Sequence, residues 1–464
     1  MGNILLMDFG STYTKVALAD TVKCEIMGTA KAHTTVASNI MLGLNEALGK
    51  LGVQGPFEKR LACSSAAGGL KMVAVGLVKD LTAEAARRAA LGAGARVLDV
   101  FSHEMTDKDL ERITDLKPEI ILLAGGTDGG NKEIILKNAR TLARLPVSLP
   151  VVVAGNRVAA PEAAEILKSR HDPVVISGNV MPELNVLRVD EARLAIRELF
   201  LAQIVKAKGL ELAEEFSGQV LMPTPAAVLK AAELLARGCG DEPGLGELMV
   251  VDVGGATTDV HSIAVGDPSK AGVSLKGLPE PYAKRTVEGD LGMRYSSMAL
   301  FEAAGRRLTG YLGTDAESLR GYIESLTRKP DYLAQTEGEK KIDSGLGRIA
   351  VEIAVERHCG ALEVIYTPFG ASYIQHGKDL TPLRTVIGTG GVLAGNPAAL
   401  EILQGAAFAP AAPNLLKPQQ PEYYLDSSYI MAGMGLLAES DPLAALKIMK
   451  KYITRLGGDQ HGSH

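Results

Sequence analysis

The chain has 464 residues, of which 46% are hydrophobic, and its 49 basic and 54 acidic side chains leave a net charge of -5. Because a single hydrophobic core rarely grows beyond ~300 residues, this length predicts two domains. No block of Lys or Arg stands out, which argues against nucleic acid as a partner. The apolar runs fall short of the ~20 residues of a membrane span, and the N-terminus lacks a secretory or myristoylation pattern. We therefore expect a cytoplasmic protein that binds neither nucleic acid nor membrane.

In the first half, residues 4–30 alternate apolar and polar positions and predict a meander of three strands, followed by a helix over 36–51. Between about residues 60 and 190, short β-rich runs alternate with amphipathic helices, a pattern typical of a mostly parallel sheet covered by helices. The expected strands there are 60–65, 96–101, 119–125, 150–155 and 173–177. Helical patterns at 191–215 and 223–237 then lead into the turn-rich stretch 238–246, which predicts a domain boundary.

The second half repeats this order. A second meander begins at Leu248, and helices near 290–308 and 345–360 precede strands near 362–374 and 385–388. A last helix is expected at 441–456. We expect a first domain with an α/β extension at 1–240, a second domain at 241–435, and a C-terminal helix with a polar tail at 436–464.

Two segments half a chain apart carry the same pattern, ILLMDFGSTYTKVAL at 4–18 and LMVVDVGGATTDVHS at 248–262. Asp8 aligns with Asp252, Gly10 with Gly254 and Thr14 with Thr258. An aspartate at the end of a buried strand can hold hydrated Mg²⁺. Glycines let backbone N–H groups approach phosphate oxygens, and a lysine adds a point charge.

A single such turn could equally be an ordinary hairpin, but two copies in register favour a pincer around a triphosphate. We expect Asp8 and Asp252 to be the metal-binding and catalytic carboxylates. The predicted phosphate-binding residues are Gly10, Ser11, Thr12, Lys15, Gly254, Gly255, Thr257 and Thr258.

A third motif, TVIGTGGVLAGNPAALEIL at 385–403, reads as a strand, a glycine turn and a helix. Gly388, Gly390 and Gly391 would let ribose and adenine lie against the backbone near a helix N-terminus. Asn396 and the following proline mark the expected start of that helix.

An analogous turn in the first half, LLAGGTDGG at 122–130, lies where domain symmetry would place the counterpart of that third motif. Asp128, or Thr127, could orient the attacking water or touch the metal as a catalytic group. Alternatively, TDGG only caps a helix that begins near Asn131. In the segment 285–294, Asp290 is a predicted N-cap and Glu288 could reach the ribose.

The order of these motifs resembles the actin, sugar-kinase and Hsp70 ATPase superfamily. MDFGSTYTK, LLAGGTDGG, VDVGGATTDVHS, TVEGDLGMR and IGTGG together resemble the GlmL family, also called MutL, the accessory protein associated with glutamate (methylaspartate) mutase. The resemblance implies an α/β fold of two RNase H-like domains, each a mixed sheet flanked by helices, with ATP and Mg²⁺ in a cleft between them. It also implies slow ATP hydrolysis and a chaperone or reactivating role toward a subunit of an adenosylcobalamin-dependent mutase.

Three other functions remain open at this stage. A small-molecule kinase would need an aspartate base beside a pocket for the acceptor, which the sequence does not single out. An ATP-driven electron-transfer activator would need thiolates for an Fe–S cluster, with Cys239 and Cys359 as candidates. An actin-like filament is the third alternative.

Overall fold

A computed structural model of the chain describes residues 2–10, 12–35, 39–53, 55–65, 70–207, 216, 220–368 and 370–457. Ser11, one of the predicted phosphate-binding residues, lies outside these described residues. Residues 208–215, at the end of the helix expected at 191–215, also lie outside them.

The first sheet has the strand order β10-β4-β1-β2-β3. Strands β1 (Asn3–Phe9), β2 (Tyr13–Asp20) and β3 (Glu25–His33) form the antiparallel meander, and β4 (Lys59–Ser64) and β10 (Val220–Pro223) extend it in parallel. Both faces of β1 are covered, because its alternate side chains enter two different cores. The meander expected at residues 4–30 is therefore present.

The second sheet repeats this arrangement, with the order β16-β14-β13-β19-β20-β21. In chain order, its first three strands form an antiparallel meander, and its fourth and fifth strands run parallel to the first. Its strands are β13 (Leu248–Val253), β14 (Thr258–Ile263), β16 (Ala283–Glu288), β19 (Thr385–Thr389), β20 (Glu422–Asp426) and β21 (Ile453–Arg455). In both sheets the strands follow the order 3-2-1-4-5 of an RNase H-like fold, which confirms the predicted α/β class with two such sheets.

A third, all-parallel sheet is inserted in the first half of the chain. Its order is β6-β5-β7-β8-β9, which is the doubly wound order 2-1-3-4-5. Its strands are β5 (Lys71–Gly76), β6 (Arg96–Ser102), β7 (Ile120–Leu123), β8 (Val151–Val153) and β9 (Val174–Ile176). We call residues 71–207 the parallel-sheet unit.

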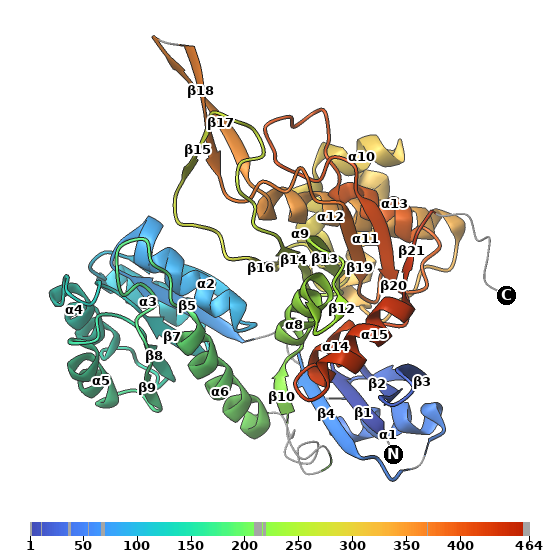
Figure 1. Cartoon of the computed structure of the whole chain (residues 1–464), viewed down its shortest axis with the longest axis horizontal. Helices are drawn as coiled ribbons and strands as arrows, with labels where there is room; N and C mark the ends of the chain where they lie inside the picture. The colour runs from blue at the N-terminus through green and yellow to red at the C-terminus, as the bar shows by residue number, and fades with distance from the viewer. Residues whose placement is uncertain are drawn as a thin grey trace.

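Helices cover both faces of the parallel-sheet unit, on the left of Figure 1. After a short π-helix, η1 (Lys79–Ala83), helix α2 packs with α6 on one face, and α3, α4 and α5 pack on the other. Their bounds are α2 (Glu84–Gly92), α3 (Asp107–Leu116), α4 (Glu133–Leu142), α5 (Ala160–Lys168) and α6 (Asp190–Ala207).

The strands of this unit differ from two of the expectations from the sequence. The strand expected at 60–65 is β4 of the first sheet, so the alternating region contributes to two sheets rather than one. Strand β5, which lies between β6 and β7, was missed because its apolar run MVAVG is buried on both sides and does not alternate.

The two RNase H-like sheets meet through a shared core. Helices α8 (Thr224–Arg237), α14 (Met431–Leu437) and α15 (Pro442–Tyr452) supply much of it, and apolar residues of β1 and β13 pack into it from either side. Helix α14 contacts α8, β4 and β1, so a helix near the end of the chain packs on the first sheet (Figure 1). At the boundary expected at 238–246, the strands β11 (Gly238–Cys239) and β12 (Glu242–Pro243) form a small hairpin.

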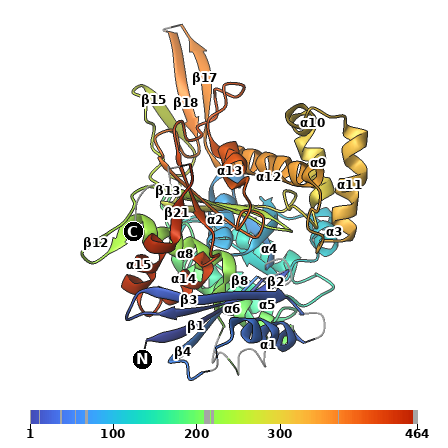
Figure 2. The same ribbon diagram turned by 90° about the vertical axis from the view of Figure 1, so that its right-hand side faces the viewer.

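Helices α9 to α13 pack on the other face of the second sheet. They are α9 (Ser297–Ala304), α10 (Arg306–Leu312), α11 (Ala316–Arg328), α12 (Glu337–His358) and α13 (Ala399–Leu403), with the 3-10 turn η2 (Gln404–Ala406). Strands β15 (Val273–Lys276), β17 (Ala361–Thr367) and β18 (Gly370–His376) form an arm that projects from the molecule in Figure 1 and Figure 2.

A further helix lies in the first half of the chain. Helix α1 (Ile40–Leu51) packs on the first sheet; the Asn39 side chain accepts from Met41 N at its start, and Gly52 with φ of 69° ends it. In the described part of the chain, no helix combines the length and the apolar character needed to cross a bilayer.

Candidate functional site

The first hairpin turns directly after Asp8. The Gly10 N–H donates to Tyr13 O at 3.1 Å, and a Cβ on Gly10 would lie 2.6 Å from that oxygen, so the turn needs glycine. Asp8 itself is only 7% exposed. Thr14 is fully buried and contacts Thr34 Oγ1, so its hydroxyl stabilises the turn from behind.

The second hairpin repeats this turn after Asp252. Here the Gly254 N–H donates to Thr257 O at 2.9 Å. Thr258, the counterpart of the first copy's buried threonine, is also fully buried and donates to Leu291 O at 2.7 Å. The predicted register between the two copies therefore holds for the backbone of both turns.

The tips of the two hairpins lie against each other. A Cβ on Gly255 would be 3.6 Å from Thr12 Oγ1, across the boundary between the two sheets. A second bridge joins the two halves at the surface, where His33 Nδ1 lies 3.7 Å from Asp331 Oδ1. The two predicted hairpins therefore lie next to each other in the structure.

Asp8 is held by three side chains. The Thr224 hydroxyl donates to its Oδ1 at 2.6 Å, Lys15 Nζ lies 3.3 Å from its Oδ2, and Cys63 Sγ donates to Oδ1 at 3.5 Å. Thr224 is the first residue of α8, 216 positions along the chain. Sequence reasoning missed it, because no local pattern links a helix start to a strand so distant.

Asp252 experiences an excess of negative charge. Burial, together with the neighbouring negative charges of Asp259, Asp8 and Asp426, raises the pKa of Asp252 to about 7. Only Lys15 opposes this effect among these charges. A carboxylate in such surroundings is stabilised by an additional cation, which is the condition expected of a metal-binding position.

The glycine turn after β19 reaches the same place. β19 pairs with β13, and Gly390, with φ of 104°, lies so close that a Cβ would be 2.7 Å from Asp252 Oδ1. A Cβ on Gly391 would meet open space, whereas one on Gly388 would meet Leu393 and Leu403 at under 3 Å. Of the three predicted glycines, Gly390 thus abuts the site carboxylate, Gly391 leaves room for a ligand, and Gly388 serves core packing.

Asp426 and Tyr429 also belong to the site, and neither was predicted. The Asp426 side chain is fully buried and accepts from the Thr389 hydroxyl at 3.0 Å and from two backbone N–H groups at the start of α14. Tyr429 follows in the left-handed region, with φ of 54°, and Lys15 Nζ lies 3.3 Å from its ring centroid. An aspartate ending the strand EYYLD just before a helix was the available signal.

Asp128 is placed elsewhere. It follows β7 in the parallel-sheet unit, so the predicted symmetry with the Gly388–Gly391 turn is wrong. Its Oδ1 accepts from Asn179 Nδ2 at 2.9 Å and from Arg157 N at 3.1 Å, which ties three loops of that unit together. Asn131 Oδ1 accepts from Ile134 N near the start of α4, in agreement with the alternative that the TDGG segment precedes a capped helix.

Asp290 and Glu288 both form ion pairs with Arg357. Arg357 reaches Glu288 Oε2 at 2.8 Å and Asp290 Oδ1 at 2.7 Å. Helix α9 begins at Ser297, so the prediction of Asp290 as its N-cap is wrong.

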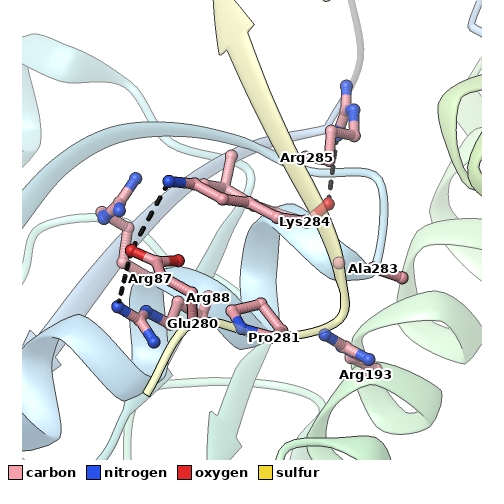
Figure 3. A pocket seen from close by; sticks show the side chains of 10 residues that line it. Arg87, Arg88, Arg193, Glu280, Pro281, Ala283, Lys284 and Arg285 are labelled. Atoms are coloured by element: carbon pink, nitrogen blue, oxygen red, sulfur yellow. Dashed lines mark hydrogen bonds and ion pairs between the residues drawn. The ribbon is translucent and has the colours of Figure 1, made fainter. Parts of the chain in front are cut away.

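The second hairpin is linked to the parallel-sheet unit through Arg285 of β16. Its guanidinium pairs with Asp259 Oδ2 at 3.0 Å and donates to the carbonyls of Leu91 and Ala95 at the end of α2. Figure 3 shows this junction, where the neighbouring Glu280 accepts from Arg88 at 3.2 Å and lies 3.5 Å from Lys284. Hydrogen bonds and ion pairs therefore connect the second hairpin to α2.

Within the ranges that the structure describes, no group of three or more His, Cys, Asp and Glu side chains is arranged to hold a metal ion. Burial raises the pKa of Cys359 to about 11, which disfavours the thiolate needed for a cluster ligand. A cation at Asp8 and Asp252 would need water and phosphate oxygens to complete its shell, as Mg²⁺ commonly does.

The paired RNase H-like sheets and their facing hairpins define an actin-like α/β protein. The family model described as MutL protein matches residues 4–453, so the chain belongs to the MutL protein family. A curated relative, Protein MutL of Clostridium tetanomorphum, is 53% identical over 462 residues, covering 98% of this chain and 100% of the relative.

Solved structures show weaker similarity. Nucleotide-free acetone carboxylase matches with a TM-score of 0.39 and 13% identity, over 94% of this chain and 70% of its own. The activator of 2-hydroxyisocaproyl-CoA dehydratase from Clostridium difficile, with bound ADPNP, matches with a TM-score of 0.33 and 9% identity. The match covers 98% of this chain and 100% of the activator chain. The strand order of the two RNase H-like sheets defines the fold.

Proposed function

We propose that the chain binds Mg²⁺-ATP between its two aspartate hairpins, hydrolyses it slowly, and uses that cycle to act on another protein. The observation that supports this most is that two copies of one turn, in separate sheets, adjoin at their tips, with Asp8 close enough for its charge to raise the pKa of Asp252. In this proposal residues 1–240 and 241–435 form the two halves around the nucleotide, and 436–464 follow as the C-terminal element.

The residues would bind either the metal ion or the phosphates, according to their chemistry. Asp8 and Asp252 would hold a hydrated Mg²⁺, which fits the excess negative charge around Asp252. Bound Mg²⁺ would neutralise charge on the phosphate oxygens. The Thr12 and Thr257 hydroxyls and the N–H groups of Ser11 and Gly255 are the proposed phosphate donors. Gly10 and Gly254 would contribute by shaping the turns, because their own N–H groups donate to Tyr13 O and Thr257 O.

Lys15 would supply a positive charge to the β or γ phosphate. Its positive charge lowers the pKa of Asp252, and it already lies beside Asp8. Gly390 and Gly391 would form the backbone surface for ribose and adenine. Open space lies over Gly391, and the preceding Gly390 abuts Asp252.

The proposed partner is a subunit of an adenosylcobalamin-dependent mutase such as glutamate mutase, toward which the chain would act as a chaperone or reactivating factor. Membership of the MutL family supports this partner, because the motifs of the chain resemble the accessory protein associated with methylaspartate mutase. Nucleotide-driven closing and opening of two domains is an established way to change the surface that a partner contacts.

The test is a comparison of Asp8→Asn and Asp252→Asn with the unaltered chain and with Asp241→Asn, an exposed carboxylate in the β11–β12 hairpin. We expect each site variant to lower Mg²⁺-ATP affinity at least tenfold and to abolish phosphate release, and the exposed variant to do neither. Undiminished binding in both site variants would refute the proposal. Affinity capture with ATP and with ADP then tests the partner, and ADP formation that depended on an added sugar would indicate a kinase instead.

A further inference from the structure

The ammonium group of Lys15 is shared between a carboxylate and an aromatic ring. Lys15 Nζ lies 3.3 Å from Asp8 Oδ2 and 3.3 Å from the centroid of the Tyr429 ring. The lysine side chain is 20% exposed, so both attractions act in partly desolvated surroundings. A cation over a tyrosine ring is worth about 0.5–2 kcal/mol, depending on desolvation.

Tyr429 is held in an unusual backbone conformation to make this contact. Its φ of 54° is uncommon for a bulky residue and persists only where the surroundings enforce it. The enforcement comes from Asp426, whose carbonyl accepts from Tyr429 N at 3.2 Å and whose buried carboxylate binds the next two backbone N–H groups. The loop between β20 and α14 is therefore shaped around this tyrosine.

The same loop is connected to the other parts of the site. The Asp426 carboxylate accepts from Thr389, the residue directly before Gly390, and Gly390 abuts Asp252. Beyond the loop, α14 packs on α8, whose first residue, Thr224, donates to Asp8. Tyr429 thus approaches Lys15 from an element that is fixed relative to both site carboxylates.

We propose that Tyr429 is the positioning residue for Lys15, and that its ring holds the ammonium where it can pass to the triphosphate. This inference rests on the proposed function and specifies how its lysine is set. Without the ring, the attraction of Asp8 acts alone on the ammonium. The lysine then competes with a cation for that carboxylate, and it is no longer oriented toward the phosphates.

The experiment measures the affinities of Mg²⁺-ATP and of AMP by calorimetry. Tyr429→Phe keeps the ring, whereas Tyr429→Asn removes it with a residue that tolerates a positive φ. We expect the phenylalanine variant to match the unaltered chain and the asparagine variant to bind ATP about fivefold more weakly, which corresponds to ~1 kcal/mol. AMP affinity should stay within twofold in both, because AMP lacks the β and γ phosphates; this also shows that the variants are folded.

A double-mutant cycle with Lys15→Met separates positioning from a general structural effect. If Tyr429 acts through Lys15, the double variant Lys15→Met with Tyr429→Asn binds ATP no more weakly than Lys15→Met alone. Additive losses, an equal loss of AMP affinity, or unchanged ATP affinity in Tyr429→Asn would overturn the inference while leaving the proposed function intact. Absence of ATP binding by the unaltered chain would instead overturn the proposed function and this inference with it.

Discussion

Asp259 occupies in the second hairpin the position that Lys15 occupies in the first. Lys15 lies directly across from Asp8 in the β1–β2 pair, and Asp259 lies directly across from Asp252 in the β13–β14 pair. One hairpin therefore pairs opposite charges and the other pairs like charges, with Arg285 neutralising Asp259 from the adjacent strand. The two copies share a backbone turn but divide the electrostatic tasks of the site.

The buried pair of Asp259 and Arg285 should be sensitive to removal of one partner. The two side chains are 9% and 3% exposed, so Asp259→Asn leaves a guanidinium with little access to water. We expect the free energy of unfolding to fall by about 3–5 kcal/mol, as measured by denaturant titration. The exposed Asp267→Asn is the control and should change it by less than ~0.5 kcal/mol. Equal stabilities of the two variants would contradict the importance of this ion pair.

Two adjacent glycines offer a matched comparison at the site. Gly390→Ala places a methyl group 2.7 Å from Asp252 Oδ1 at a residue with φ of 104°, whereas Gly391→Ala meets nothing within 4 Å. We expect Gly390→Ala to lower the melting temperature without ligand by several degrees, through at least ~1–3 kcal/mol of strain, and Gly391→Ala to leave it nearly unchanged. A differential scanning measurement in which both variants melt alike would show that Gly390 is not constrained as described.

Lys378 should make stability depend on pH. Its side chain is fully buried, its ammonium donates to the carbonyls of Ala264 and Tyr282, and burial lowers its pKa to about 7. Above that value the folded chain has released a proton that the unfolded chain still binds up to its normal pKa near ~10.4, so this group makes stability rise with pH between about 7 and 10.

The measurement is the unfolding free energy at pH 7 and at pH 9 for the unaltered chain and for Lys378→Met. We expect the methionine variant to lose the part of the increase that Lys378 supplies, about 1.4 kcal/mol per pH unit at most. Lys270→Met, at an exposed position, should keep the full increase. If the slopes of all three proteins coincide, Lys378 does not titrate as described.

The hydroxyl of Thr389 should matter more than a surface hydroxyl in the same kind of bond. Thr389 is 2% exposed and donates to the buried carboxylate of Asp426 at 3.0 Å. Replacing it with valine, which has the same shape, should cost about 1.5–3 kcal/mol, because the bond involves a charged acceptor. Thr381→Val removes a comparable bond to Asp379 at a half-buried position, where water can substitute, and should cost less. The opposite ranking in denaturant titrations would be evidence against this assignment.

The sequence predicted the parts of the site that depend on short stretches of chain. Each hairpin is closed by a backbone hydrogen bond between residues three apart, such as Gly10 N to Tyr13 O, so the residues that form the turn are neighbours in the sequence. The repeat of that pattern, with Asp8 and Asp252 in register, was therefore visible without a structure. So was the α/β class, because strand and helix periodicities are local properties.

The parallel-sheet unit shows where local patterns were insufficient. Periodicity identified most strands between residues 60 and 190, but it does not say which strands pair. The pairing of the strands places β4 in a different sheet from β6 to β9, and it places Asp128 in a different sheet from the hairpins of Asp8 and Asp252.

The sequence by itself determined the two aspartate turns, their glycines, and the lysine that follows the first turn. Each turn is formed by contacts between residues only a few positions apart. Only the tertiary structure decided that Thr224, Asp426 and Tyr429 surround Asp8 and Lys15, from more than 200 positions away. These contacts arise from the packing of α8 and α14 between the two sheets, which is set by the whole core rather than by any local pattern.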